Sequence, residues 1–194
     1  MRRDAHSSDR FPEDVLELQG FLRGESTIPG VAAVPGAGTN VPLYILGSSL
    51  FGARLAAMLG LPFAFASHFA PGSLIDAMQL YRREFRPSEQ LAEPYAIAAV
   101  NVIAADSDDE AQEQWTTVRR WRIARFVTPG RDLADVEADA ILASPQGQQI
   151  AQMMHYSAVG TPDHVAAYLD EFAAVCGADE LITAHASPTI DQRL

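Results

Sequence analysis

The stretch Val41–His68 reads VPLYILGSSLFGARLAAMLGLPFAFASH and is the clearest indication of the fold. It opens with a short apolar run at Leu43–Leu46 and closes with a second one at Phe63–Ala66. The residues between them have one broad apolar side and end at Gly60, which is typical of a helix that stops at a glycine. Two buried strands joined by a helix form a βαβ unit, so this stretch predicts two neighbouring parallel strands.

The same alternation continues on both sides of this stretch. Apolar residues at spacings of three and four predict helices, and uninterrupted apolar runs predict strands that are covered on both faces. The predicted helices are Phe11–Leu22, 71–86, 107–128 and 162–176, the further strands are Tyr95–Ala105 and Glu180–Ala184, residues 25–41 are loop, and Gly130–Tyr156 is helical but irregular. This order predicts an α/β fold with a parallel sheet, either a doubly wound open sheet or part of a (β/α)8 barrel.

The composition is typical of one globular domain in a reducing compartment. At 194 residues and 48% hydrophobic content, the chain is long enough to bury a substantial core. It has no apolar run long enough to span a bilayer, and its charged start lacks the apolar segment of a secretory signal. Cys176 is the single cysteine and has no partner for an internal disulfide. We therefore expect a cytoplasmic protein.

The charge excludes several kinds of partner and of chemistry. A net charge of −11 argues against nucleic acid or an anionic membrane as the partner. All 14 basic residues are arginine, so chemistry that needs a Schiff-base lysine or a phosphate-loop lysine is excluded. The sequence has no HExxH, CxxC or GxSxG motif and no carboxylates paired at metal spacing, so it predicts neither a metal site nor a hydrolytic triad.

The turn Gly47-Ser48-Ser49 after the first strand is a candidate anion site. Glycine lets a ligand approach the backbone, the first N–H groups of a helix have no partner inside it, and the helix dipole favours negative charge there. The two hydroxyls add donors, and Gly52 follows one turn later. An alternative is that Ser48 or Ser49 simply caps the helix.

Polar residues at strand ends are the other candidates. Ser67 and His68 follow the second strand, at the edge of a parallel sheet where sites are built, and His68 could act as an acid or base there. The alternative is a histidine bonded to a backbone carbonyl, and the same two interpretations apply to His185 after the last strand. Asn101 interrupts an apolar run, so it either lines a cavity or pins neighbouring strands, and we favour pinning. The arginine pairs at 82–83 and 119–120 lie on polar helix faces and are expected to face solvent.

These segments resemble the bacterial luciferase-like flavin-dependent monooxygenases. The similarity lies in the motifs LGSS and FASHFAP and in further matches at Phe11–Leu18, Ala33–Asn40, Asn101–Glu110 and Val159–Asp163, so it touches nearly the whole chain in order. The resemblance implies a (β/α)8 barrel in which the predicted strands are the fifth to the eighth. It also implies that Met1–Asp4 corresponds to a point just before the family's fourth helix.

The resemblance implies a cofactor and residues that hold it. The family uses reduced FMN supplied by a separate reductase, or in some branches a deazaflavin, and oxidises a small organic substrate with O2. Its flavin phosphate binds at the turn after the fifth strand, which here gives Gly47, Ser48, Ser49 and Gly52, although relatives often have a hydroxyl where this chain has Gly52. His68 would face the flavin or the substrate as the catalytic residue.

The extent of the resemblance leads to an expectation about completeness. We expect residues 1–194 to form a single partial domain, the C-terminal half of the barrel, truncated at the N-terminus and lacking the last helix. A half barrel has open edges, which favours pairing into a homo-oligomer or with another half. The alternatives are a catalytically inactive half barrel and a deazaflavin-dependent oxidoreductase.

Overall fold

The computed structural model describes residues 10–26 and 28–193, and these residues fall into two compact units, which we describe separately. The segment Met1–Asp4, which the resemblance places before a helix, lies outside the described residues. In the first unit, which ends at Tyr44, helix α1 (Phe11–Arg23) stops at Gly24 in the left-handed conformation, with φ of 82°. The described residues of 25–41 form no helix or strand, as predicted for this loop, and the first strand begins at Ile45, two residues later than predicted.

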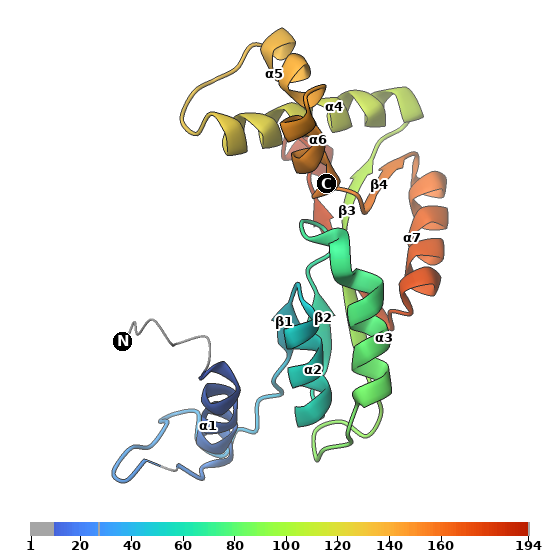
Figure 1. The fold of residues 1–194 in the computed structure, drawn as a ribbon. Coiled ribbons are helices and arrows are strands. Elements are labelled where there is room, and N and C mark those ends of the chain that lie inside the picture. The colour runs from blue at the N-terminus through green and yellow to red at the C-terminus, as the bar shows by residue number, and fades with distance from the viewer. Residues whose placement is uncertain (1–9, 27, 194) are drawn as a thin grey trace. The chain divides into compact units, whose positions relative to one another are not determined.

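The second unit, residues 45–194, alternates strands and helices (Figure 1). Its elements in chain order are β1 (Ile45–Gly47), α2 (Leu50–Leu59), β2 (Phe63–Phe65), α3 (Leu74–Glu84), β3 (Ala96–Ala104), α4 (Asp108–Val127), α5 (Asp135–Leu142), α6 (Pro145–Gln152), β4 (Ser157–Gly160), α7 (Pro162–Cys176) and β5 (Glu180–His185). Every strand pair is parallel. The predicted α/β fold with a parallel sheet is therefore confirmed.

Strand β3 is the centre of the sheet. Its residue Ile97 pairs with both β2 and β5, and its residue Asn101 pairs with both β4 and β5. Strand β5 therefore runs along one side of β3, while β2 and β4 follow one another along the opposite side. Strand β1 pairs with β2 at the outer edge.

The core lies between the sheet and helices α2 and α3. Phe63 and Phe65 of β2 are fully buried, and the ring of Tyr81 from α3 lies 5.5 Å from that of Phe63. Side chains of paired residues in parallel strands project to the same face, so Leu46, Ala64 and Ile97 share the opposite face. Leu46 is 67% exposed there, so the outer edge of this face is open to solvent.

Helix α4 lies across the carboxyl end of the sheet, with α5 and α6 next to it (Figure 1). Ala111 and Val118 of α4 are buried against Ile103 of β3, and Trp115 and Val159 pack on the same cluster. The helix begins where the sequence predicts, because the Ser107 hydroxyl accepts a hydrogen bond from the Glu110 N–H at 3.2 Å. The carboxyl edge of the sheet is thus partly covered by a helix.

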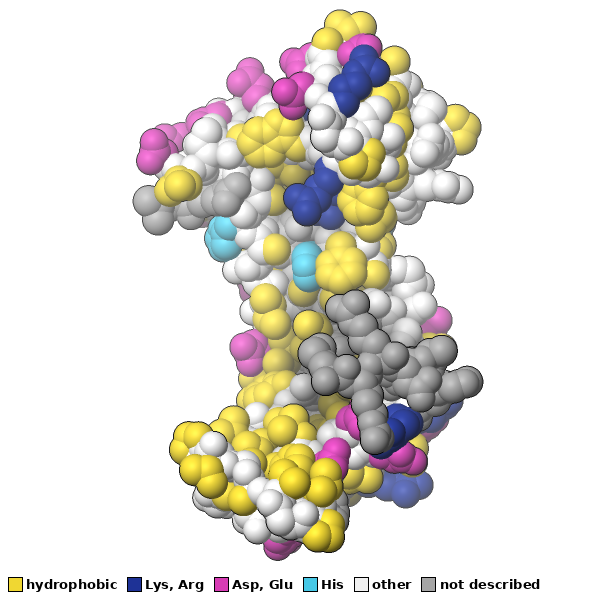
Figure 2. All heavy atoms as spheres, turned by 90° about the vertical axis from the view of Figure 1, so that its left-hand side faces the viewer, with side chains coloured by type: hydrophobic (Ala, Val, Ile, Leu, Met, Phe, Trp, Pro, Cys, Tyr) yellow, Lys and Arg dark blue, Asp and Glu magenta, His cyan; other side chains and the backbone are white. Residues whose placement is uncertain are grey.

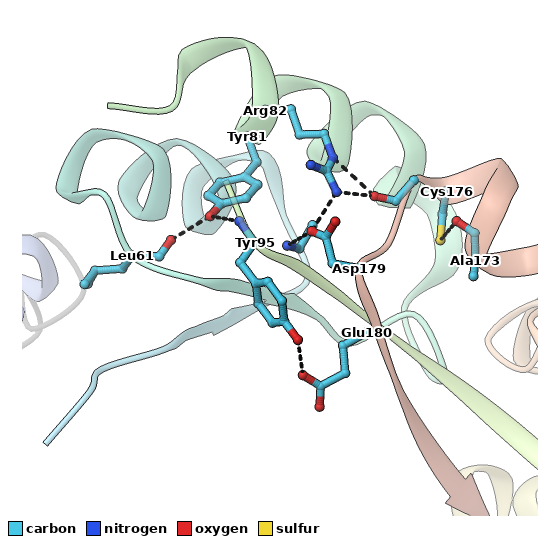
Figure 3. Close-up of polar contacts among 10 residues, drawn as sticks. Leu61, Tyr81, Arg82, Tyr95, Ala173, Cys176, Asp179 and Glu180 are labelled. Carbon is cyan, nitrogen blue, oxygen red and sulfur yellow. Dashed lines mark hydrogen bonds and ion pairs between the residues drawn. The ribbon is translucent and has the colours of Figure 1, made fainter. Parts of the chain in front are cut away.

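The amino ends of the strands are joined by a polar network (Figure 3). The Tyr81 hydroxyl donates to the Leu61 carbonyl at 2.9 Å and accepts from the Tyr95 N–H at 3.0 Å. Arg82 donates to the Gly177 carbonyl at 2.6 Å and to Asp179 at 2.7 Å. The expectation that Arg82 simply faces solvent is therefore wrong, because the turn that joins α7 to β5 brings an acceptor pair to it.

The predictions differ from the structure mainly in residues 130–160. The irregular helical region is two separate eight-residue helices, α5 and α6. Arg120 donates to Asp135 at 2.7 Å and to Asp139 at 2.6 Å, so this arginine is also paired rather than simply solvated. Strand β4 was not predicted, because its four residues become a strand only by pairing with β3, which is distant in sequence.

Within the described ranges, no helix combines the length and the apolar character that crossing a membrane requires.

Candidate functional site

The turn between β1 and α2 leaves its polar groups available. Ser49 is the N-cap residue of α2, with extended backbone, but its side chain makes no capping bond to the helix. Both Ser48 and Ser49 are exposed. The first-turn N–H groups of a helix have no partner within it, so this turn presents two hydroxyls and the positive end of a ten-residue helix. The alternative in which a serine simply caps the helix is therefore not supported at Ser49, because its side chain makes no capping hydrogen bond.

Gly52 has a different position from the two serines. It is buried, and a Cβ built on it would lie 3.5 Å from the Gly47 Cα and 3.5 Å from the Phe63 ring. A side chain at this position therefore points at the sheet, and the absence of one lets α2 pack closely on β1. Any contact from Gly52 to a ligand at the turn comes from its backbone N–H.

A backbone hydrogen bond joins the two predicted site segments. The Ala66 N–H donates to the Gly47 carbonyl at 2.9 Å, so the ends of β1 and β2 lie side by side. Ser48 and Ser49 follow one strand and Ser67 and His68 follow the other. The structure thus brings together the ends of both strands that the sequence singled out.

Ser67 and Asn101 hold the end of β2 in place. Ser67 is fully buried, and its hydroxyl donates to the Ala99 carbonyl and accepts from the Ala99 N–H at 3.2 Å. The Asn101 amide donates to the His68 carbonyl at 2.8 Å, to the Ser157 hydroxyl at 3.3 Å and to the Tyr156 carbonyl at 3.4 Å. Asn101 therefore pins β2 to β4 across β3, as the favoured interpretation predicts.

The imidazole of His68 is half-buried, and two effects favour its uncharged form. Burial lowers the pKa of His68, and the charge of Arg122 lowers it further. Its Nδ1 atom is buried and has no hydrogen-bond partner among the described residues. We assign the ring proton to Nε2, because an unpartnered buried N–H costs more than an unpartnered lone pair. The ring also meets that of Phe69 edge-on, at 4.7 Å.

The other histidines of the described chain are less suited to a site. His185 is exposed, and its Nε2 lies 3.1 Å from the Thr183 hydroxyl. His155 is exposed and meets the ring of Tyr156 at 4.8 Å. Across residues 10–26 and 28–193, the structure contains no group of three or more His, Cys, Asp or Glu side chains that could hold a metal.

Arg122 is a candidate that the sequence predictions missed. It follows Val118 by four residues on α4, so it continues the face on which Ala111 and Val118 are buried. It is half-buried, and burial lowers the pKa of its guanidinium, as does the charge of Arg125. The spacing 111–115–118–122 is visible in the sequence, and a charged residue on an otherwise apolar helix face is the signal that could have identified it.

Known families and proteins share the sequence that forms this arrangement. Residues 10–180 match the family described as luciferase-like monooxygenase. The chain belongs to the luciferase-like monooxygenase family. It is 39% identical to YvbT of Bacillus subtilis (strain 168) over 189 residues, which is 94% of this chain and 55% of that protein. It is 38% identical to a luciferase-like monooxygenase of Escherichia coli (strain K12) over 181 residues, 90% of this chain and 52% of that protein.

Solved structures agree with this membership of the luciferase-like monooxygenases. The crystal structure of apo-MsnO8 superposes with a TM-score of 0.80 at 30% identity, covering 96% of this chain and 58% of that one. Two more distant structures share the fold alone. One is a coenzyme F420 dependent tetrahydromethanopterin reductase from Methanopyrus kandleri, with a TM-score of 0.58 at 16% identity, covering 93% of this chain and 59% of that one. The other is a riboflavin lyase with modified FMN, with a TM-score of 0.52 at 18% identity, covering 82% of this chain and 42% of that one.

The chain spans about half the length of the curated relatives it matches. The motif segments on which the resemblance rests, from Phe11–Leu18 to Val159–Asp163, all lie within the matched residues. The resemblance inferred from LGSS and FASHFAP is thereby confirmed as a family relationship.

Proposed function

We propose that this chain contributes the phosphate-binding half of a flavin-dependent monooxygenase site. The single observation that carries the proposal is the junction of two turns, in which the Gly47 carbonyl accepts the Ala66 N–H at 2.9 Å. That bond joins the end of β1, just before Ser48 and Ser49, to the end of β2, two residues before His68, which supports a site shared by the two turns. Membership of the luciferase-like monooxygenases, and folds shared with F420- and FMN-linked enzymes, support a cofactor of the flavin type.

The residues at the turn fit the phosphate of FMN. Ser48 and Ser49 are exposed hydroxyl donors, and the free first-turn N–H groups of α2 point in the same direction as the positive end of the helix dipole. Gly47 carries no side chain that would block the approach of a ligand. Gly52 would contribute only its N–H, because its Cβ position faces the sheet.

The proposed chemistry divides between the cofactor and the chain. When bound, reduced flavin supplies the electrons that let O2 oxidise a small organic substrate, and a separate flavin reductase would supply it in that state. The protein orients the reactants and excludes water. His68 is the proposed catalytic residue: its neutral ring holds a proton at Nε2, and the Asn101 bond to its carbonyl fixes its position.

A comparison of FMN with riboflavin tests the phosphate assignment. Riboflavin lacks only the phosphate, so it serves as the matched control ligand. We expect the double substitution Ser48→Ala and Ser49→Ala to weaken FMN binding about tenfold or more, as is typical for charge-assisted hydrogen bonds, and to leave riboflavin binding unchanged. The measurement is flavin fluorescence titration of the purified chain. Equal losses for both ligands would refute the assignment.

The position of His68 is tested without any turnover assay. We expect the ring proton signals of His68 in an NMR spectrum to shift on addition of FMN, while those of exposed His164 stay in place. His164 is the internal control because it lies on α7, with its Nδ1 atom 2.8 Å from Asp108 at the start of α4, and not beside the ends of β1 and β2. If His164 moves and His68 does not, flavin binds elsewhere and the proposed site is wrong.

A further inference from the structure

The inward face of α4 ends in a charge. Trp115 and Val118 pack on the cluster around Ile103, and Arg122 lies one turn beyond Val118 on the same face. Ile123, its neighbour, is fully buried. Helix α4 lies across the carboxyl end of the sheet (Figure 1), and the charge of Arg122 acts on His68, which follows β2.

Arg122 is half-buried without an anionic partner. Within the part of the chain that the structure describes, no hydrogen bond or ion pair is made by its side chain. By contrast, Arg120, two residues earlier on the same helix, forms ion pairs with Asp135 and Asp139. Removing a guanidinium from water without a partner is unfavourable, so the Arg122 position favours an anion that comes from outside the described residues.

The surroundings of Arg122 are positive in an otherwise acidic chain. The charge that acts on His68 is that of Arg122, and the charge that acts on Arg122 is that of Arg125. Figure 2 shows one face of the molecule on which basic side chains lie near a histidine, with apolar side chains around them. A local positive field of this kind in a chain of net charge −11 attracts a small anion selectively.

The neighbouring side chains indicate what kind of anion this is. Phe69 is exposed and lies against the ring of His68, and Phe126 is exposed one turn after Arg122. A guanidinium matches a carboxylate or a phosphate through paired N–H donors. Because the proposed phosphate site is the turn at Ser48 and Ser49, the second anion is better explained as the carboxylate of an apolar molecule.

We propose that Arg122, with the neighbouring His68, binds the carboxylate of an apolar organic acid that serves as the substrate. This inference rests on the proposed function, since it names the substrate class of the same site. Arg122 is thereby a specificity-determining residue: its guanidinium selects the acid over a neutral molecule of the same shape.

Benzoate and its neutral analogue benzamide are the probes that test this proposal. We expect benzoate to shift the NMR signals of the His68 ring in the full chain, and benzamide to bind at least about tenfold more weakly. Arg122→Gln should weaken benzoate about tenfold and leave benzamide unchanged. Arg122→Lys keeps the charge but loses the paired donors. Its affinity for benzoate should therefore lie between that of the unsubstituted chain and that of Arg122→Gln.

A matched control separates a local effect from a general loss of positive charge. Arg119→Gln removes a charge from the same helix, three residues before Arg122 and near Asp139, and should leave benzoate affinity unchanged. Equal binding of benzoate and benzamide by the unsubstituted chain would overturn the proposal. So would an unchanged benzoate affinity in Arg122→Gln with a native circular dichroism spectrum.

Cofactor binding distinguishes failure of this proposal from failure of the proposed function. If Arg122→Gln weakens FMN binding as much as the Ser48 and Ser49 substitutions do, Arg122 serves the cofactor and the substrate assignment is wrong. If inorganic phosphate displaces benzoate at equal concentration, the site does not select carboxylates, and the assignment is also wrong. Neither outcome alters the comparison of FMN with riboflavin, which alone tests the phosphate turn.

Discussion

Tyr81 shows at the residue scale how one hydroxyl can satisfy two backbone groups. The side chain is fully buried, and its oxygen donates to the Leu61 carbonyl and accepts from the Tyr95 N–H. These two residues precede β2 and β3, so the hydroxyl links the starts of two adjacent strands (Figure 3). Burial raises the pKa of Tyr81, which keeps the phenol protonated and able to donate.

Replacing Tyr81 with phenylalanine should destabilise the chain by roughly 1–3 kcal/mol, because the buried Leu61 carbonyl and the half-buried Tyr95 N–H both lose their hydrogen bond to the hydroxyl. Urea unfolding should show a lower midpoint with an unchanged slope. Tyr44→Phe is the matched control, since Tyr44 is exposed and should change the free energy of unfolding by less than about 0.5 kcal/mol. Equal midpoints for the two variants would contradict the role given to the Tyr81 hydroxyl.

At the scale of elements, helix ends decide how the strands and helices connect. Gly60 ends α2 in the left-handed conformation with φ of 64°, and a Cβ built there would lie 2.5 Å from the Arg86 carbonyl oxygen. The Ser88 hydroxyl donates to the Gly60 carbonyl at 2.8 Å, so this turn also holds the loop after α3. Both the backbone angle and the contact require glycine.

Gly60→Ala should therefore cost more than the roughly 1 kcal/mol of a left-handed alanine alone, because the loop at Arg86 must also move. Thermal unfolding is the measurement. Gly72→Ala provides the comparison, since Gly72 is exposed, has an ordinary φ and would have open space around its Cβ. A melting temperature for Gly60→Ala as high as that for Gly72→Ala would rule out the steric argument.

A second link between elements depends on pH. Asp108, at the start of α4, accepts hydrogen bonds from His164 Nδ1 at 2.8 Å and from the Thr161 N–H at 3.0 Å, and both lower the pKa of Asp108. The pKa of this carboxyl is lower in the folded state than in the unfolded state, where it is about 4. Its ionised form therefore stabilises the fold fully at pH values above the unfolded-state pKa, and this contribution is lost as the pH falls through the folded-state pKa.

The stability difference between the unsubstituted chain and Asp108→Asn should accordingly be largest near pH 6 and shrink below about pH 4. Urea midpoints measured from pH 6 to pH 3 give the comparison. Asp109→Asn is the control, because Asp109 occupies the same first helical turn but makes neither contact. A difference for Asp108→Asn that is constant across this range would show that the carboxylate charge is not involved.

At the scale of the whole molecule, the sheet has an open edge. Among residues 10–26 and 28–193, strand β1 pairs with β2 alone, and Leu46 on that strand is 67% exposed. Ile182, on the other outer strand β5, is 46% exposed. Unpaired strand edges with apolar side chains are templates for association with another chain.

We predict concentration-dependent self-association that Leu46→Lys reduces, since a lysine on an edge strand opposes pairing. Light scattering after size-exclusion chromatography at several protein concentrations measures it. Met58→Lys has the same charge change at a residue of α2 with comparable exposure, 54%, and should leave association unchanged. If both variants associate equally, the β1 edge is not the surface involved.

The sequence by itself determined the α/β order, the parallel sheet, most helix ends and the family. These features depend on local spacing, on capping residues such as Ser107 and Gly60, and on continuous motifs. Only the tertiary structure decided the pairing of β4 with β3, the pinning of β2 by Asn101, and the position of Arg122 near His68. Those contacts join residues that are distant in sequence, so they depend on how the strands and helices pack together, and no local pattern encodes that packing.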